Sequence, residues 1–162
     1  MYLSFGTAAL ALLLATGAAH AQASVGFDTG DRDPDAPVEV TADRLDVNQT
    51  DGTAIFTGNV VVVQGDLRMT ADRVRVEYGE TTPREIARIH AFDNVTLVSP
   101  TETAEGAEAV YEVASETVVM TGDVVLTQEL NVVSGEMLTI DLVTGEGVVE
   151  GRVRTLLRTG DE

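Results

Sequence analysis

The sequence predicts an all-β protein of about sixteen short antiparallel strands, in a curled sheet whose first and last strands are open edges. Three observations support this fold class. Apolar and polar residues alternate almost without interruption from Val38 to about Leu157. Turn residues recur at short intervals, and no window of helical length carries an apolar stripe of helical spacing. Similar strand pairs recur along the chain, as expected for a stacked supersecondary unit.

The first 21 residues have the features of a cleavable secretory leader. The apolar run at 7–21 ends in Ala19-His20-Ala21, a small-residue site after which cleavage would leave Gln22 first. The run is short for a membrane span, which needs about 20 apolar residues. Because residues 1–6 contain no Lys or Arg, a misassigned start codon or an uncleaved anchor remains an alternative.

Composition divides the remaining chain into three parts. Residues 22–37 are acidic, contain Pro34 and Pro37 and show no periodicity, so they are predicted to form a flexible leader. Residues 38–157 are predicted to form the β domain, and 158–162 a short tail.

Charge and cysteine content exclude several classes of function. The chain has 10 basic and 27 acidic residues and a net charge of −17, which argues against binding nucleic acid or an anionic membrane surface. A hydrophobic content of 44% argues against disorder in the domain. The chain contains no cysteine, which excludes disulfides and thiol chemistry.

Individual strands are recognised by their period of two. The segments at 44–47 (RLDV), 73–78 (RVRVEY) and 138–142 (LTIDL) each place apolar residues on one face. Facing is ambiguous at 60–63, where four valines follow one another, and at 129–133. The expected turns between strands are Asp51-Gly52, Gly58-Asn59, Gly65-Asp66, Gly79, Asp93-Asn94, Gly122-Asp123 and Gly145.

The repeated unit is about 30 residues long. The segment at 57–78 returns in similar form at 121–142, and the dipeptides Gly58-Asn59, Asp93-Asn94, Gly122-Asp123 and Gly151-Arg152 follow one another at this spacing. Such units bury their apolar faces by stacking on their neighbours. The strands are too short for a membrane barrel, and the edges of an open stack invite strand addition from another chain.

Three blocks of the sequence carry a resemblance to a known family. They are PVEVTADRLDV at 37–47, FTGNVVVVQGDLRMTADRVRVEY at 56–78 and AVYEVASETVVMTGDVVL at 109–126. In this order they resemble the LptA/OstA-like family of periplasmic lipopolysaccharide-transport proteins, over about Pro37 to Val153. The segment 79–90 matches the family poorly, and the chain ends soon after Arg158 without a Lys-rich tail.

The resemblance implies a sixteen-stranded, taco-like β-jellyroll that holds the acyl chains of lipopolysaccharide inside. It implies a bridge across the periplasm, with inner-membrane LptC-like and outer-membrane LptD-like partners at the edge strands and a head-to-tail homo-oligomer. Shielding a methylene group from water contributes about 0.8 kcal/mol, so an apolar lining could hold a lipid without strong polar contacts.

The candidate lipid-binding residues are those that alternation places inside. The resemblance puts Val38, Tyr111 and Val113 first. Plain core packing is the alternative explanation, and with the resemblance most of the set is expected to form both the core and the lipid-binding groove. The set is Val38, Val40, Leu45, Val47, Phe56, Val60, Val62, Val74, Val76, Val95, Leu97, Tyr111, Val113, Met120, Val124, Leu126, Leu138 and Ile140.

The edges and the charged residues suggest where proteins would bind. Val38 and Val40 near the first strand, and Arg152 and Arg154 near the last, are candidate interface residues. The acidic residues at 28–35 lie before the first strand, so opposite charges are predicted at opposite ends. The carboxylates Asp43, Asp72, Glu108 and Glu136 share one repeat position, as solvated charges or as a divalent-cation ladder.

No motif indicates catalysis, a cofactor or a metal site. A single histidine, His90, remains after the leader, and the sequence has no G-x-S-x-G motif and no phosphate-binding loop. The sequence therefore predicts a periplasmic lipopolysaccharide carrier. The alternatives are a structural β-repeat protein that binds only proteins, and the periplasmic domain of an LptC-like anchored relative.

Overall fold

The computed structural model describes residues 21–31, 33–81 and 85–158, so the predicted leader, except Ala21, and most of the predicted tail lie outside it. No helix in these ranges is both long and apolar enough to cross a membrane. Their regular structure consists of eleven strands: β1 (Gln22–Gly26), β2 (Glu39–Thr41), β3 (Arg44–Asn48), β4 (Thr53–Gln64), β5 (Leu67–Tyr78), β6 (Ile86–Val98), β7 (Glu102–Glu112), β8 (Thr117–Gln128), β9 (Asn131–Asp141), β10 (Glu146–Glu150) and β11 (Arg154–Leu156).

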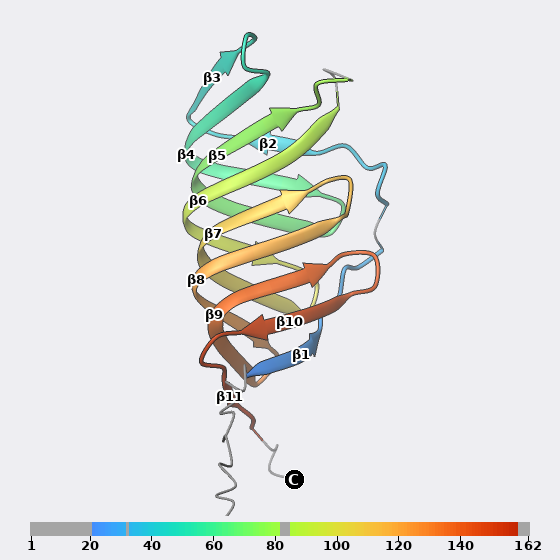
Figure 1. Ribbon diagram of the computed structural model, residues 1–162, viewed down its shortest axis with the longest axis vertical. Coiled ribbons are helices and arrows are strands. Elements are labelled where there is room, and N and C mark those ends of the chain that lie inside the picture. The colour runs from blue at the N-terminus through green and yellow to red at the C-terminus, as the bar shows by residue number, and fades with distance from the viewer. Residues whose placement is uncertain (1–20, 32, 82–84, 159–162) are drawn as a thin grey trace, which may run out of the picture.

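These strands form one antiparallel sheet in the order β1-β10-β9-β8-β7-β6-β5-β4-β2, in which β3 also pairs with β4 and β11 also pairs with β9. From β4 to β10 each strand pairs with the next in the sequence, so the sheet is a meander. Figure 1 shows it curling along its length, with β3 at one end and β1 and β11 at the other. The predicted all-β, antiparallel, curled sheet is confirmed.

The long strands bend in the middle. The pairing register shifts there, between Thr57 and Val60 in β4 and at matching points in the strands that follow. The dipeptides Gly58-Asn59 and Gly122-Asp123 have positive φ angles at these points. A left-handed residue in a bulge bends the strand sharply. The expectation that these dipeptides, and likewise Asp93-Asn94, are turns between strands is wrong, because the chain continues into the same strand.

The row of bends, here called the fold line, divides the sheet into two facing half-sheets. At the ends of the sheet two shorter strands replace one long strand, with β2 and β3 either side of Ala42-Asp43 and β10 and β11 either side of Gly151-Arg152. In the described residues half-sheet A contains nine segments, from β3, β4, β5, β6, β7, β8, β9, β10 and β1. Half-sheet B contains eight, from β2, β4, β5, β6, β7, β8, β9 and β11. The sixteen predicted strands correspond to these segments without β1.

Side chains close the fold line on its outer side. Asn59 Nδ2 donates to Asp43 Oδ2 at 2.9 Å, and Asn94 Nδ2 donates to Asp72 Oδ2 at 2.7 Å. Further along, Arg152 Nε donates to Glu136 Oε1 at 2.8 Å. Carboxylates of the predicted ladder therefore bind the bend residue of a neighbouring strand. The described residues contain no group of three or more His, Cys, Asp or Glu side chains that could hold a metal ion.

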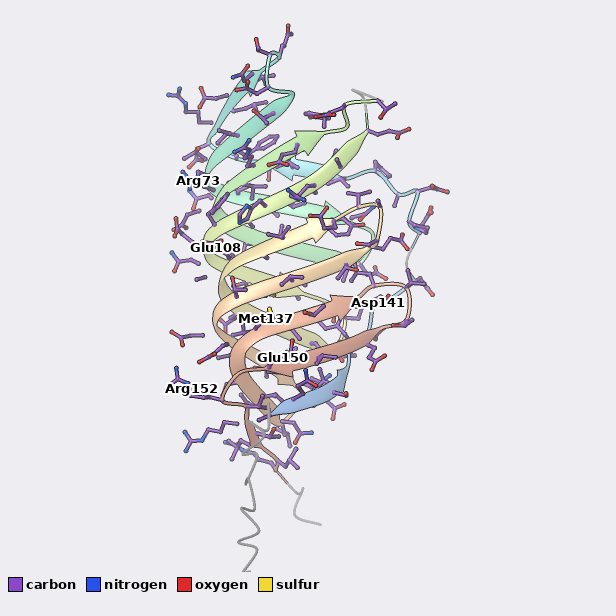
Figure 2. The ribbon with its side chains drawn as sticks, viewed as in Figure 1. Arg73, Glu108, Met137, Asp141, Glu150 and Arg152 are labelled. Atoms are coloured by element: carbon purple, nitrogen blue, oxygen red, sulfur yellow. The ribbon has the colours of Figure 1, made fainter. Side chains whose placement is uncertain are left out.

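The carboxylates of the predicted ladder lie opposite the bends of the neighbouring strands. On β7 this position is occupied by Ala107 and not by Glu108. A Cβ atom on Gly122 would lie 2.5 Å from Ala107 Cβ, as one on Gly58 would lie 2.5 Å from Asp43 Oδ2. Glu108 instead contacts His90 Nε2 at 3.1 Å. Figure 2 shows Glu108 on this outer side of the molecule together with Arg73 and Arg152.

We expect the fold-line hydrogen bonds to contribute little individually. Asp72→Ala, Asn94→Ala and the double variant form a double-mutant cycle for one such bond. Because the bond lies between exposed side chains, the coupling free energy should be about 0.5–1 kcal/mol in urea unfolding. A coupling near zero would show that the carboxylate is only a solvated charge.

The core lies between the half-sheets and mixes small and large apolar side chains along each strand. Four buried alanines lie within two residues of the fold line, Ala71, Ala91, Ala104 and Ala109, but so do the fully buried Met120 and Leu138. Larger buried residues such as Leu67, Met69 and Ile89 lie farther along the strands. Burial also settles both ambiguous segments, since Val60, Val62 and Val133 point inward and Leu130 is exposed.

The chain before β2 is ordered where it is described, against the expectation of a flexible leader over 22–37. Residues 22–26 form β1, and residues 27–31 and 33–38, here called the strap, run from β1 to β2 on the side opposite the fold line (Figure 1). The Phe27 side chain is buried, and its N–H donates to the Gly145 carbonyl at 2.7 Å. The composition of the segment hides this order, because the contacts that hold it come from distant turns.

Candidate functional site

The candidate site is the apolar interior between the half-sheets, here called the groove. Where the groove opens toward the strap it contains a cavity of about 50 Å³. No charged side chain belongs to its lining, which comprises Val38, Val62, Gln64, Leu67, Met69, Ile89, Leu97, Tyr111, Val118 and Leu142. Such a lining favours hydrocarbon and offers little to a charged ligand.

Most of the predicted interior residues are buried in the groove. The fully or almost fully buried ones are Val60, Val62, Val74, Val76, Val95, Leu97, Met120, Val124, Leu126, Leu138 and Ile140. Val38, Val40, Phe56 and Tyr111 are partly buried and pack against this core. The structure thus places residues from seven different strands in one continuous apolar layer.

Leu45 and Val47 belong to the inner face but lie uncovered. They pair in register with Phe56 and Ala54, which point inward, yet they remain 52% and 61% exposed. The reason is topological, since β3 is the last segment of half-sheet A at its end of the sheet. Alternation predicts which face a residue occupies, and only the fold shows whether anything covers that face.

Val113 lies outside the strands, in the turn between β7 and β8. Its N–H donates to the Ala87 carbonyl at 3.1 Å, and its side chain is partly exposed. Tyr111, two residues earlier, is the member of this pair that lines the cavity.

Five apolar cavity residues are absent from the predicted set: Leu67, Met69, Ile89, Val118 and Leu142. Alternation could have found Leu67 and Met69, since they lead through Ala71 into the inward run of β5. Ile89 lies within the segment 79–90, which resembles the family poorly, so the resemblance does not indicate its facing. Val118 and Leu142 flank turns, where the period of two is interrupted.

The strap is held along the open side by polar contacts to hairpin turns of half-sheet B. Asp28 N–H donates to the buried carboxylate of Glu102 at 2.9 Å, and Ser99 Oγ donates to the same oxygen at 2.7 Å. Asp31 N–H donates to Asp66 Oδ2 at 3.2 Å, and Gln64 Nε2 donates to the Ala36 carbonyl at 3.1 Å. These contacts place the strap beside the cavity, with Val38 in the lining.

Charged pairs lie on the outer faces, away from the groove. Arg44 donates to both carboxylate oxygens of Asp46 at 2.7 and 2.6 Å, which lowers the pKa of Asp46 below its usual value. The hydrogen bond to Asp46 likewise raises the pKa of Arg44. Arg88 donates to Glu112, and that hydrogen bond raises the pKa of Arg88. Since these groups are exposed, they influence solubility more than stability.

The predicted interface residues lie near the ends of the sheet. Val40 is on β2 at one end of half-sheet B, while Arg154 is exposed on β11 at the other. The acidic residues after β1 run along the open side from the end that carries Arg154 (Figure 1). The prediction of opposite charges at opposite ends is therefore wrong, because the strap carries the acidic residues along the molecule from the end at which β11 lies.

The comparisons with known proteins agree with this geometry. Residues 39–146 match the family described as LptA/(LptD N-terminal domain) LPS transport protein. An uncharacterised protein of Rhizobium meliloti (strain 1021) is 34% identical over 133 residues, which cover 76% of this chain and 72% of that protein. The lipopolysaccharide export system protein LptA of Escherichia coli (strain K12) is 26% identical over 142 residues, which cover 85% of this chain and 77% of LptA.

A solved structure shares the fold. It is LptH of Pseudomonas aeruginosa, described as the LptA homologous periplasmic component of the lipopolysaccharide transport device, with a TM-score of 0.70 and 19% sequence identity. The match covers 78% of this chain and 99% of the LptH chain. Fold, matched residues and relatives together show that the chain belongs to the family of LptA and LptD N-terminal-domain lipopolysaccharide transport proteins.

Proposed function

We propose that the chain is a periplasmic bridge protein that carries lipopolysaccharide from the inner to the outer membrane. Its groove would shield the acyl chains, and the sugar headgroup would stay outside. The observation that carries this proposal is the apolar layer that continues between the half-sheets from strand to strand. Contacts of this kind are non-directional and hold a chain without fixing it at one position, as transport requires.

Acyl chains must widen the groove to enter it. A cavity of about 50 Å³ is smaller than the roughly 150 Å³ that accommodates a single benzene molecule. Side-chain hydrogen bonds connect neighbouring strands at the fold line, whereas the cavity lies on the strap side. We therefore propose that the half-sheets separate on the strap side, with the fold line as the hinge.

The edge strands are the proposed contacts with protein partners. Both ends of the sheet present strands with one unpaired side, and such edges accept a strand from another chain. An LptC-like partner in the inner membrane, an LptD-like partner in the outer membrane and further copies of this chain would extend the sheet end to end.

Site-specific photo-crosslinking in cells tests the carrier function. A photoreactive residue at Tyr111 or Val118, both in the cavity lining, should form lipopolysaccharide adducts. A residue at the exposed position Arg75, on the opposite face of β5 from Val74 and Val76, is the matched control and should form none. Adducts from Arg75 alone would refute a lipid-filled groove. Adducts to proteins alone, from any of these positions, would favour a structural β-repeat protein instead.

A further inference from the structure

Strand β1 makes one end of the sheet uneven. It pairs with β10 through five residue pairs, from Gln22 opposite Glu150 to Gly26 opposite Glu146. At this end half-sheet B stops at β11, while half-sheet A continues past β10 to β1 (Figure 1). At the other end β2 and β3 both pair with β4, so the two half-sheets end at the same strand position. Without β1, the half-sheets would also end at the same strand position here, because β10 and β11 both pair with β9.

Strand direction shows what fits at each end. Every pair in half-sheet A is antiparallel, so β3, β5, β7, β9 and β1 run one way and β4, β6, β8 and β10 run the other. In a head-to-tail stack, β3 of the next molecule keeps the direction of β3. It would lie antiparallel to β10 but parallel to β1. In half-sheet B the next β2 would lie antiparallel to β11.

The residues of β3 also suit the place that β1 occupies. Both strands have five residues in the same polar and apolar alternation, QASVG in β1 and RLDVN in β3. The inner residues Ala23 and Val25 of β1 are partly buried against β10, whereas Leu45 and Val47 of β3 are 52% and 61% exposed. A second molecule that donates β3 to β10 would cover its two exposed apolar side chains.

We propose that β10 is the addition site for β3 of a second copy of this chain, and that β1 is the internal strand which occupies this site until it is displaced. The proposal rests on the end-to-end assembly proposed above and adds its regulation. After release of β1, half-sheet A ends at β10 and half-sheet B ends at β11. Every strand pair formed with the next molecule is then antiparallel. An occupied β10 stops growth in half-sheet A at that end.

The contacts of β1 suit a strand that detaches as a unit. Gln22 Nε2 donates to Glu150 at one end of the strand, and Gln128 Nε2 donates to the Gly26 carbonyl at the other. The buried Phe27 follows at once, anchored at Gly145. A tethered strand has an effective concentration on the order of millimolar, so β1 would outcompete a second molecule at low protein concentration.

Truncation is the first test. The chain that begins at Phe27 lacks β1 but keeps the strap and its buried anchor, and it is compared with the chain that begins at Gln22. Sedimentation velocity over a concentration series should show that the truncated chain forms head-to-tail oligomers at concentrations at least tenfold lower. In the truncated chain, Leu45→Asp with Val47→Asp should abolish these oligomers, which identifies β3 as the strand that is added.

A disulfide lock is the second test. Ser24 and Val148 lie opposite each other and point away from the buried residues Val149 and Gly147. Directly opposite residues are about 4.5–5.5 Å apart at Cβ, close to the separation that a disulfide bridges. The chain has no native cysteine, so Ser24→Cys with Val148→Cys forms a single bridge. The oxidised protein should stay monomeric, and the same sample after reduction should assemble as the unmodified chain does.

Each outcome decides the proposal. If truncated and locked chains both assemble as the unmodified chain does, β1 is a permanent part of the end of the sheet and the proposal is wrong, while the end-to-end bridge stands. If the truncated chain stays monomeric at every concentration, a second copy is not the occupant of β10. Lipopolysaccharide crosslinking at Tyr111 reports on the carrier function independently, since it requires only the groove.

Discussion

Gly122→Ala should be among the most destabilising single-methyl additions in this protein. Gly122 lies at the fold line with a φ angle of +86°, and a Cβ atom there would lie 2.5 Å from Ala107 Cβ. The left-handed conformation costs a non-glycine residue roughly 1–2 kcal/mol. Relief of the overlap requires a shift of the backbone of β7 or β8, which costs about 1–3 kcal/mol more. Urea unfolding should show a loss of about 3 kcal/mol.

Gly65→Ala is the matched control. Gly65 also has a positive φ angle, +57°, but no atom lies within 4 Å of the position that its Cβ would take. We expect a loss of roughly 1 kcal/mol, from backbone conformation alone. The difference between the two variants measures how tightly the fold line is packed. Equal losses would mean that neighbouring strands at the fold line move apart without cost.

The fold class follows from the sequence because alternation and turn residues act locally. RVRVEY at 73–78 alternates in the sequence, and Val74 and Val76 are buried in the structure. The strand boundaries do not follow as well. A Gly-Asn pair with positive φ angles forms either a hairpin or a bulge, and only the pairing of both neighbours of β4 shows that Gly58-Asn59 is a bulge.

Long-range contacts explain what sequence reasoning missed. The segment at 22–37 reads as a polar leader because its stabilising partners, such as Gly145 and Glu102, are more than 70 residues away. Local composition cannot reveal that β10 provides an edge for β1. The position of the acidic residues along the open side depends on the same pairing.

The sequence predicts which residues face the groove where the apolar and polar residues of a strand alternate without interruption. Residues in the middle of strands, such as Val74, Met120 and Leu138, lie in the interior as alternation indicates. Residues next to turns, such as Val113 and Val118, required the structure, because a turn resets the alternation. The structure was also needed to show whether an inward-facing residue is covered by other side chains. Leu45 belongs to the inner face yet is exposed at the end of the sheet.

Val118→Glu should abolish lipopolysaccharide binding, whereas Val119→Glu should leave it intact. The two residues are adjacent in β8 and face opposite sides, with Val118 buried in the cavity lining and Val119 partly exposed on the outer face. A carboxylate in the lining has no charged partner there and would adjoin hydrocarbon, which costs several kcal/mol. A loss of about 3 kcal/mol corresponds to a binding constant more than 100-fold weaker.

The buried charge at Val118 also lowers stability, so a milder variant separates binding from folding. Val118→Thr keeps the shape of the side chain and adds one hydroxyl group, at a cost of roughly 1–2 kcal/mol in an apolar site. It should bind a fluorescent lipopolysaccharide about tenfold more weakly while circular dichroism shows a folded sheet. If Val118→Thr and Val119→Thr bound equally well, the acyl chains would not lie between the half-sheets. Because the same layer forms the core and the groove, each interior polar group should weaken both folding and lipid binding, and the outer face should tolerate the same change.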